Sequence, residues 1–193
     1  MGILNSSISG KFRTEYKGCT IAVGVSGDKH SRYALKWALE NLVTSTNDVV
    51  VKLIHVTQTS PSPSPKDSPG NSRLINDGHA FDPIEEMLLP FRCYCTRKRV
   101  PFEVVILKDH DVAKALIDYI SRYGIENIIL GVSSKIGFSK RLFKTSDISS
   151  SVQKLAADFC NVYIINKGKI WAVRAARRQL PALPALPEEF SKM

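Results

Sequence analysis

The stretch Glu126–Ser146, ENIILGVSSKIGFSKRLFKTS, decides how the rest of the chain is interpreted. Its first part contains a short apolar run that ends in Gly131, which is typical of a strand buried on both faces in a parallel sheet. A loop rich in Ser, Gly, Lys and Arg follows, and a helix is expected from about Ile148. Open α/β sheets bind anionic ligands where a strand leads through such a loop into a helix N-terminus. The stretch therefore predicts an α/β fold with an anion site after this strand.

Outside this stretch, apolar runs of strand length alternate with segments of helical period. Further strands are expected at 20–25, 48–56, 101–107 and 161–165, and helices at 29–43, from 82 onward, at 111–123 and at 148–158. Such alternation indicates βαβ units, and hence a parallel sheet covered by helices on both faces. The pattern predicts a three-layer α/β/α sandwich around a five-stranded parallel sheet, but it leaves the order of the strands open.

The composition changes along the chain suggest three regions. Residues 1–18 are mostly small or polar and are expected to form a flexible lead. The domain is expected to span 19–169, with a Ser/Pro-rich insertion at 57–80 that lacks apolar residues for a core and is expected to be disordered. Residues 170–193 are expected to form a tail, a short basic helix from Trp171 followed by a Pro/Ala/Leu segment. The Ser-Pro dipeptides of the insertion resemble proline-directed phosphorylation sites, and a plain linker would show the same dipeptides.

Composition and charge narrow the class of partner. The 193 residues carry a formal net charge of +9, and 44% of them are hydrophobic, which is typical of globular proteins. A basic balance favours anionic partners such as nucleotides, acidic lipids or acidic protein surfaces, and it specifies no nucleic acid. The four cysteines have no metal-ligand spacing, which favours reduced thiols in the cytosol. No apolar run approaches the roughly 18 residues that a membrane span needs.

The first six residues, MGILNS, match the pattern for N-myristoylation of Gly2. A single acyl chain binds membranes only marginally, so attachment needs a second signal, for which Lys11, Arg13 and Lys17 are candidates. Chance matches to so short a pattern are common, and an ordinary frayed N-terminus is the alternative. The expected location is cytoplasmic, with the nucleus and weak membrane association at the plasma membrane through an acylated Gly2 left open.

Four short stretches carry a resemblance to a known family. They are ALKWA (34–38), LPFRCYC (89–95), DISSSV (147–152) and DFCNVY (158–163). Together they resemble the universal stress protein domain of the adenine nucleotide α-hydrolase-like superfamily, over a match from Thr20 to about Lys169. The resemblance is strongest to the plant form, including the domain that precedes the kinase and U-box parts of some plant receptor-like cytoplasmic kinases. It implies a Rossmann-like strand order of 3-2-1-4-5. Because kinase and U-box sequences are not found here, it does not imply those activities for this chain.

The resemblance also implies an adenine nucleotide, above all ATP, as the ligand, with Mg²⁺ accompanying it. In ATP-binding members the fourth strand leads into Gly-x2-Gly-x9-Gly-(Ser/Thr), whose small residues let backbone N–H groups approach the phosphates. Gly131 matches this motif, Ser134 and Lys144 replace its other glycines, and Thr145 keeps the hydroxyl. The family's aspartate after the first strand, which helps hold the nucleoside, is Ser26 here. The implied phosphate contacts are Gly131, Ser133, Ser134, Thr145 and Ser146, assisted by Lys144, and the implied nucleoside contacts are Val25, Ser26, Gly27 and Val56.

These departures from the motif leave two functions open. Lys144 has a Cβ where a backbone with positive φ favours glycine, whereas the lysines and Arg141 of the same loop bring positive charge to the phosphate end. The first interpretation is weak or degenerate adenine nucleotide binding in plant stress response or signalling. The alternative is a non-catalytic interaction module that has lost its nucleotide and works with kinases or ubiquitin-ligase components. A homodimer through the fifth strand is common in the family and is expected under either interpretation.

The sequence assembles no catalytic set. None of its four histidines has a recognisable nucleophile or metal partner, and no Walker-type lysine motif is present. Enzyme activity is therefore not expected.

Overall fold

The computed structural model describes residues 20–43, 49–58, 82–132 and 148–181. The strands are β1 (Thr20–Gly24), β2 (Val50–Gln58), β3 (Phe102–Asp109), β4 (Asn127–Gly131), β5 (Asn161–Asn166) and β6 (Lys169–Arg174), and the helices are α1 (Lys29–Asn41), α2 (Pro83–Lys98), α3 (Val112–Tyr123) and α4 (Ile148–Leu155). Gly2, the rest of the predicted lead, residues 59–80 of the predicted insertion and the last twelve residues lie outside this description. The first two residues of the predicted insertion, Thr57 and Gln58, belong to β2.

Three helices begin at an aspartate whose side chain accepts a hydrogen bond from a backbone N–H of the first turn. Asp28, Asp82 and Asp111 cap α1, α2 and α3 in this way. In α2 the cap is followed by Pro83, which suits the first helical position because the missing N–H would have no partner there. The helix starts expected from the sequence are therefore set by local capping chemistry.

The strands form one sheet in the order β3-β2-β1-β4-β5-β6. The first five strands run parallel in the expected order, and β6 pairs antiparallel with β5. The expectation of five strands, with a basic helix from Trp171, is wrong. Lys167 and Gly168 both have positive φ (51° and 79°), which is the backbone that a two-residue hairpin turn requires. The apolar and β-branched residues that follow this turn suit a strand, so the chain folds back on β5.

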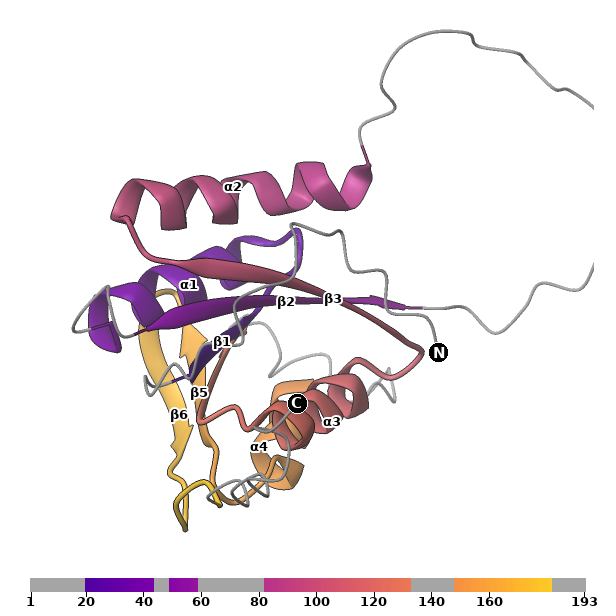
Figure 1. The fold of residues 1–193 in the computed structure, drawn as a ribbon, viewed down its shortest axis with the longest axis vertical. Coiled ribbons are helices and arrows are strands. Elements are labelled where there is room, and N and C mark those ends of the chain that lie inside the picture. Colours follow the sequence, from indigo (N-terminus) through magenta and orange to yellow (C-terminus); the bar gives the residue numbers. More distant parts are fainter. Residues whose placement is uncertain (1–19, 44–48, 59–81, 133–147, 182–193) are drawn as a thin grey trace, which may run out of the picture.

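Helices cover both faces of the sheet, which confirms the three-layer sandwich (Figure 1). α1 and α2 lie on one face, and α3 and α4 lie on the other. Buried residues on the α1/α2 face include Ile21, Val23, Leu35, Leu53 and Phe91, and those on the α3/α4 face include Ala22, Ile54, Leu116, Ile128 and Val162. Because successive side chains of a strand point to opposite faces, β1 contributes to both clusters. This explains why the central strands read as continuous apolar runs.

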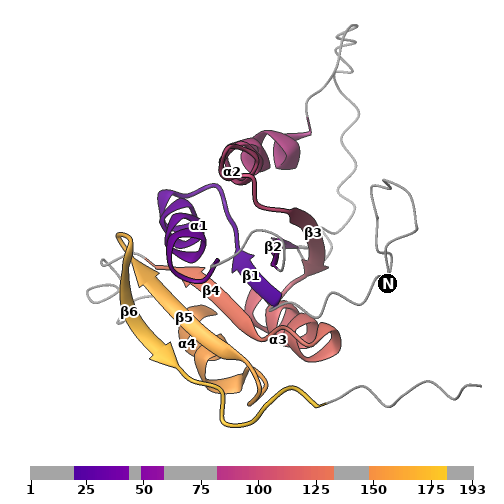
Figure 2. The same cartoon turned by 60° about the vertical axis from the view of Figure 1, so that its left-hand side comes forward.

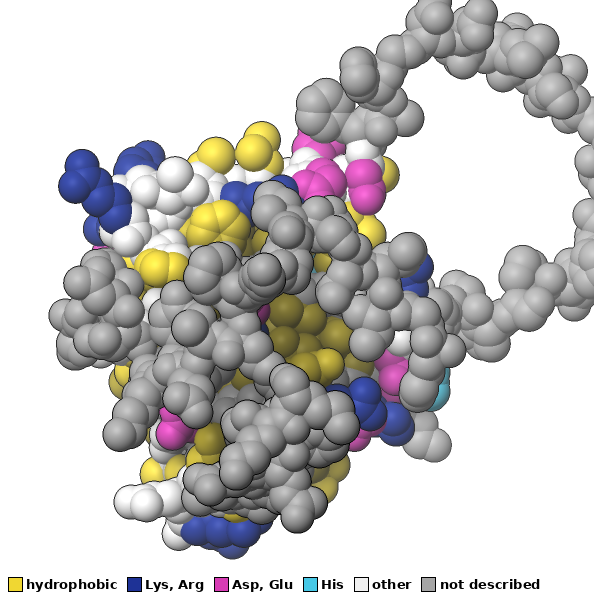
Figure 3. Space-filling model, viewed as in Figure 1, with side chains coloured by type: hydrophobic (Ala, Val, Ile, Leu, Met, Phe, Trp, Pro, Cys, Tyr) yellow, Lys and Arg dark blue, Asp and Glu magenta, His cyan; other side chains and the backbone are white. Residues whose placement is uncertain are grey.

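The edge strand β3 is less well covered than the central strands. Its residues 104–107 are all half-buried. Hydrophobic side chains are visible in a recess between the α2 layer and α3 on this side of the molecule (Figure 3). In the ranges that the structure describes, no helix has both the length and the apolar content needed to cross a bilayer.

Candidate functional site

Five of the ten predicted site residues come together at one edge of the sheet. Val25, Ser26 and Gly27 follow β1, Val56 lies near the end of β2, and Gly131 ends β4. Because β1 pairs in parallel with both β2 and β4, these residues share the carboxyl edge of three adjacent strands. This is the edge where open α/β sheets place their ligands.

The other half of the predicted site lies outside the described residues. Ser133, Ser134, Lys144, Thr145 and Ser146 all belong to the undescribed range 133–147, as do the other cations of that loop. Their contact with phosphate stays a prediction. The structure can therefore be examined only for the nucleoside half and for Gly131.

Gly131 lies directly against the first turn of α1. A Cβ atom added there would fall 2.2 Å from the carbonyl oxygen of His30, 2.4 Å from its carbonyl carbon and 2.8 Å from the backbone nitrogen of Ser31. No real Cβ tolerates such distances to backbone atoms, so only glycine fits. The residue that matches the nucleotide motif thus has a second reason to be glycine, which is the close packing of β4 against α1.

A hydrogen-bond network occupies the turn between β1 and α1. One carboxylate oxygen of Asp28 accepts from the backbone N–H groups of His30 and Ser31, each at 2.8 Å, and the other accepts from the Ser26 hydroxyl at 3.1 Å. The Ser26 hydroxyl also lies 2.9 Å from the hydroxyl of Ser31, which in turn accepts from the Ser26 backbone N–H at 3.1 Å. Ser31 is buried at this point. Both carboxylate oxygens of Asp28 therefore accept hydrogen bonds from within the protein.

The pKa of Asp28 reflects this network. Partial burial alone would raise the pKa, but the hydrogen bonds from Ser31, Ser26 and His30 together outweigh burial and lower it below its usual value of 3.8. The capping carboxylate is therefore ionised throughout the neutral range. The sequence predicts a helix from residue 29, but it gives no sign of the role of Ser31, which has no motif signal beyond its place three residues after Asp28.

Replacing Asp28 by alanine is expected to lower the free energy of unfolding by about 1 kcal/mol at pH 7, because two N–H groups of α1 lose their acceptor. Asp28→Ser should retain most of the stability, since serine is a comparable cap. Because the pKa is lowered in the folded state, this contribution is present above about pH 4 and is lost as the pH falls through the folded-state pKa, below 3.8. Urea unfolding at pH 7, pH 5 and pH 3.5 measures it. Equal stability of wild type and Asp28→Ala at pH 7 and pH 5 would contradict the capping role.

The remaining nucleoside residues offer backbone rather than side chains. Val25 is 5% exposed and belongs to the core on the α1/α2 face, and Val56 packs against the core on the α3/α4 face. The carbonyl of Val25 lies 3.0 Å from Nδ1 of His55, so this ring nitrogen carries the proton and donates. The arrangement holds the ends of β1 and β2 together and supports the edge of the site.

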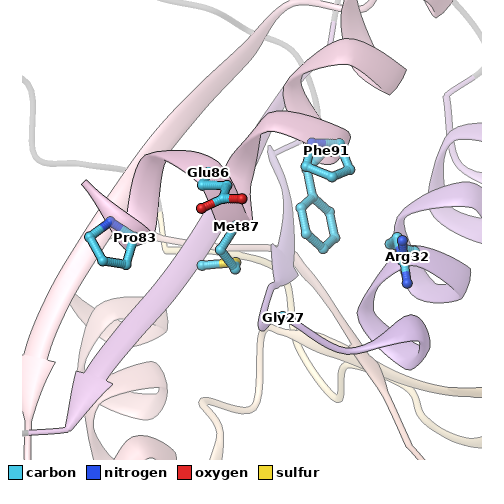
Figure 4. Close-up of a pocket in the computed structure, with 7 residues that line it drawn as sticks. Gly27, Arg32, Pro83, Glu86, Met87 and Phe91 are labelled. Atoms are coloured by element: carbon cyan, nitrogen blue, oxygen red, sulfur yellow. The ribbon is translucent and has the colours of Figure 1, made fainter. Parts of the chain in front are cut away.

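A hollow of about 360 Å³ opens next to this edge, between α1 and α2. It is lined by Gly27, Arg32, Pro83, Glu86, Met87, Pro90 and Phe91. Gly27 is the member of this lining that belongs to the predicted site, and the ring of Phe91 and the side chain of Met87 extend toward the β1–α1 turn (Figure 4). The hollow has apolar walls with one acid, Glu86, and one base, Arg32, and it borders the nucleoside half of the predicted site at Gly27.

Two cysteines of the described residues are buried. Burial raises the pKa of the Cys95 thiol to about 11 and that of the Cys160 thiol to about 12, so both are neutral at physiological pH. Within the described ranges, no group of three or more His, Cys, Asp and Glu residues could hold a metal ion. The carboxyl edge of β1, β2 and β4 can bind a ligand through backbone groups and through the hydroxyl of Ser26.

Comparison with known proteins agrees with this fold. The family model described as "Universal stress protein family" matches residues 19–157. The Arabidopsis thaliana protein named U-box domain-containing protein 35 is 33% identical over 163 residues, which cover 78% of this chain and 18% of that protein. The chain spans about a fifth of the length of this protein and of two further Arabidopsis thaliana relatives, U-box domain-containing protein 51 and putative U-box domain-containing protein 53.

Two solved structures share the fold. A universal stress protein family protein from Arabidopsis thaliana with AMP bound superposes with a TM-score of 0.53 at 22% identity, covering 77% of this chain and 91% of that one. A universal stress protein in complex with cAMP gives a TM-score of 0.52 at 13% identity, covering 77% of this chain and 97% of that one. At these identities the likeness shows the fold.

Proposed function

Because the chain belongs to the universal stress protein family, we propose that it binds an adenine nucleotide weakly at the carboxyl ends of β1, β2 and β4, in plant stress response or signalling. The observation that carries this proposal is the gathering of Ser26, Gly27, Val56 and Gly131 at the carboxyl edge of adjacent parallel strands, which is where open α/β sheets place their ligands. The adenine nucleotides in the two solved neighbours support the choice of ligand.

The nucleoside half fits such a ligand incompletely. A ribose needs an acceptor for its hydroxyl groups, and a carboxylate is the strongest acceptor available to a protein. The carboxylate of Asp28 is committed to Ser26 and to the first turn of α1, and Ser26 offers only a hydroxyl that already has two partners. This predicts weak binding, with a dissociation constant of about 100 µM or higher. Mg²⁺ would arrive with the phosphates, whose predicted contacts are Gly131, Ser133, Ser134, Thr145 and Ser146 together with Lys144.

Exchanging the two side chains, Ser26→Asp with Asp28→Ser, is expected to tighten AMP binding about tenfold. The variant keeps a cap on α1 and places a free carboxylate at the position that faces the ribose, and a hydrogen bond to a charged group contributes about 1.5 kcal/mol. Isothermal titration with AMP, ADP and ATP, with magnesium and at two salt concentrations, measures the affinities. Asp28→Ser alone is the matched control, because it changes the cap without adding an acceptor.

Two further results test the proposal. Thr145→Ala together with Lys144→Glu should weaken the binding of all three nucleotides while the unfolding midpoint stays unchanged. Wild-type protein that gives no saturable heat, or heat that disappears with salt and is the same for ribose phosphate as for AMP, would mean a generic basic surface rather than a nucleotide site.

A second candidate function is an interaction module for kinases or ubiquitin-ligase components. It is favoured by the relatives, because the matching region occupies about a fifth of longer proteins, several of which are named for a U-box domain. The expected homodimer contact through β5 meets a structural obstacle. β5 pairs with β4 on one side and with β6 on the other, so a second copy must approach β6 or displace it.

A further inference from the structure

The sixth strand exposes an unusual amount of apolar surface. Ile170 is 53% exposed, Trp171 is 69% exposed and Val173 is 45% exposed, although all three are large hydrophobic residues on a strand of six. We refer to these three residues as the β6 strip. In contrast, the other tryptophan of the chain, Trp37, is only 8% exposed.

The β6 strip belongs to the α1/α2 face of the sheet. Val173 pairs with Tyr163, and Ile170 pairs with Ile165, whose side chains both pack in the core on that face. Trp171 lies between them, at the irregularity in the pairing of β5 with β6. Ala172, by contrast, packs against the core on the opposite face. The strip is therefore a continuation of one apolar sheet face and not a set of scattered side chains.

The helix layer on this face ends before the strip. α1 packs across β1, β4 and β5, and the ring of Trp37 lies 5.3 Å from that of Tyr163. Beyond α1, β6 forms the outer edge of the sheet (Figure 2). Among the strands that α1 packs on, β4 is the middle one, and β6 lies two strands, or about 10 Å, farther out. Packed helices lie about 8–10 Å apart, so one more helix beside α1 would lie over β6.

Unpaired lysines border one end of the strip. Lys167 and Lys169 flank the turn between β5 and β6, and Lys29 begins α1 at the same carboxyl edge of the sheet. All three are exposed, and among the described residues none of them forms an ion pair, whereas Lys36 farther along α1 pairs with Glu40. An apolar strip with cations at one end is complementary to an amphipathic segment with acidic residues at one end.

We propose that the β6 strip is a docking site for an amphipathic helix of another polypeptide, with an apolar face on Ile170, Trp171 and Val173 and acidic residues in its first turn against Lys29, Lys167 and Lys169. Acidic residues are favourable at a helix N-terminus, so the charges would sit where such a helix carries them best. A second copy of this chain fits less well, because each copy has a net charge of +9 and the lysines at its strip would repel the same lysines of the other copy. The proposal is independent of nucleotide binding.

The probe is a synthetic amphipathic peptide of about 18 residues, long enough for several helical turns, with a leucine face and glutamates in its first turn. Its counterpart carries lysines at the same positions. Anisotropy of the labelled peptides measures binding, and the tryptophan emission of the protein should move to shorter wavelength, because Trp171 loses contact with water. The glutamate peptide is expected to bind at least tenfold more tightly than the lysine peptide. Trp171→Ser and Val173→Ser should each lower the affinity about tenfold or more.

The matched control is Leu89→Ser, which removes an equally exposed apolar side chain (55%) from α2 and should leave peptide binding unchanged. The urea midpoint of each variant shows that it is folded. Absence of saturable binding of the glutamate peptide below about 1 mM, or equal binding of both peptides, overturns the proposal. Two other results would replace it. One is sedimentation as a dimer that depends on Trp171, which assigns the strip to a second copy. The other is Trp171-dependent binding to phosphatidylserine vesicles without peptide binding, which assigns the strip to a lipid surface.

Discussion

Replacing Gly131 by alanine is expected to lower the free energy of unfolding by about 3 kcal/mol. The added methyl group would lie 2.2 Å from the His30 carbonyl oxygen and 2.8 Å from the Ser31 nitrogen, which are backbone atoms of α1 and cannot rotate away. Relief requires either β4 or the first turn of α1 to move. Ser31 is part of the network that caps α1, so such a movement would also disturb the hydrogen bonds of Asp28. Urea unfolding monitored by circular dichroism measures the loss.

Gly27→Ala is the matched control. A Cβ at Gly27 would meet only the Met87 side chain at 3.5 Å, which is ordinary contact, so a change within about 0.5 kcal/mol is expected. If Gly131→Ala is as stable as Gly27→Ala, the close packing of β4 against α1 is wrong. A large loss at Gly131 would mean that this glycine is required by the fold, whether or not a nucleotide binds. Its match to the nucleotide motif would then say little about function.

The sheet could be predicted from the sequence because its central strands are buried on both faces. The runs that became β1 and β4 are continuous apolar segments, the run that became β2 is apolar up to Val56 apart from Lys52 and His55, and this signal is local. The order of the strands is a long-range property, and it followed from the family resemblance and not from any run of residues. The structure has that order.

The sixth strand could not be predicted because the residues that form it do not by themselves distinguish a strand from a helix, and the turn that brings them back against β5 is seen only in the folded chain. Alanines and arginines beside Trp171 suggested a basic helix, whereas the decisive feature is the positive φ at Lys167 and Gly168, a property of the folded backbone. The same limit applies to the site. That a helix would begin just after Asp28 could be predicted, but that both carboxylate oxygens of Asp28 would be occupied could be seen only once Ser26 and Ser31 were placed.

Replacing Arg174 by methionine is expected to lower the free energy of unfolding by about 3 kcal/mol. From β6, its guanidinium group donates to the carbonyl oxygens of Ala156 at 2.8 Å, Ala157 at 2.7 Å and Cys160 at 2.9 Å, which follow the last turn of α4. These carbonyls are at a helix C-terminus, where backbone acceptors lack partners within the helix. Methionine retains the apolar stem but removes all three donated hydrogen bonds, and within the described part of the chain only the Ala157 carbonyl keeps another donor, the backbone N–H of Cys160 at 3.0 Å. Each lost hydrogen bond to a charged group costs about 1.5 kcal/mol or more, less where water enters.

The control for this prediction is Arg178→Met. Arg178 pairs with Asp158 at 2.8 Å, but both side chains are about half exposed, so water screens the pair and its loss should change the stability little. Arg174→Lys should recover part of the loss, because one ammonium group cannot reach all three carbonyls in the fork geometry of arginine. If Arg174→Met is no less stable than Arg178→Met, the link between β6 and α4 adds nothing to the fold. A loss of the expected size means that α4 depends on β6 for its C-terminal hydrogen bonds. The strand that carries the proposed docking strip would then be an integral part of the domain, and a partner bound there would act on a rigid element.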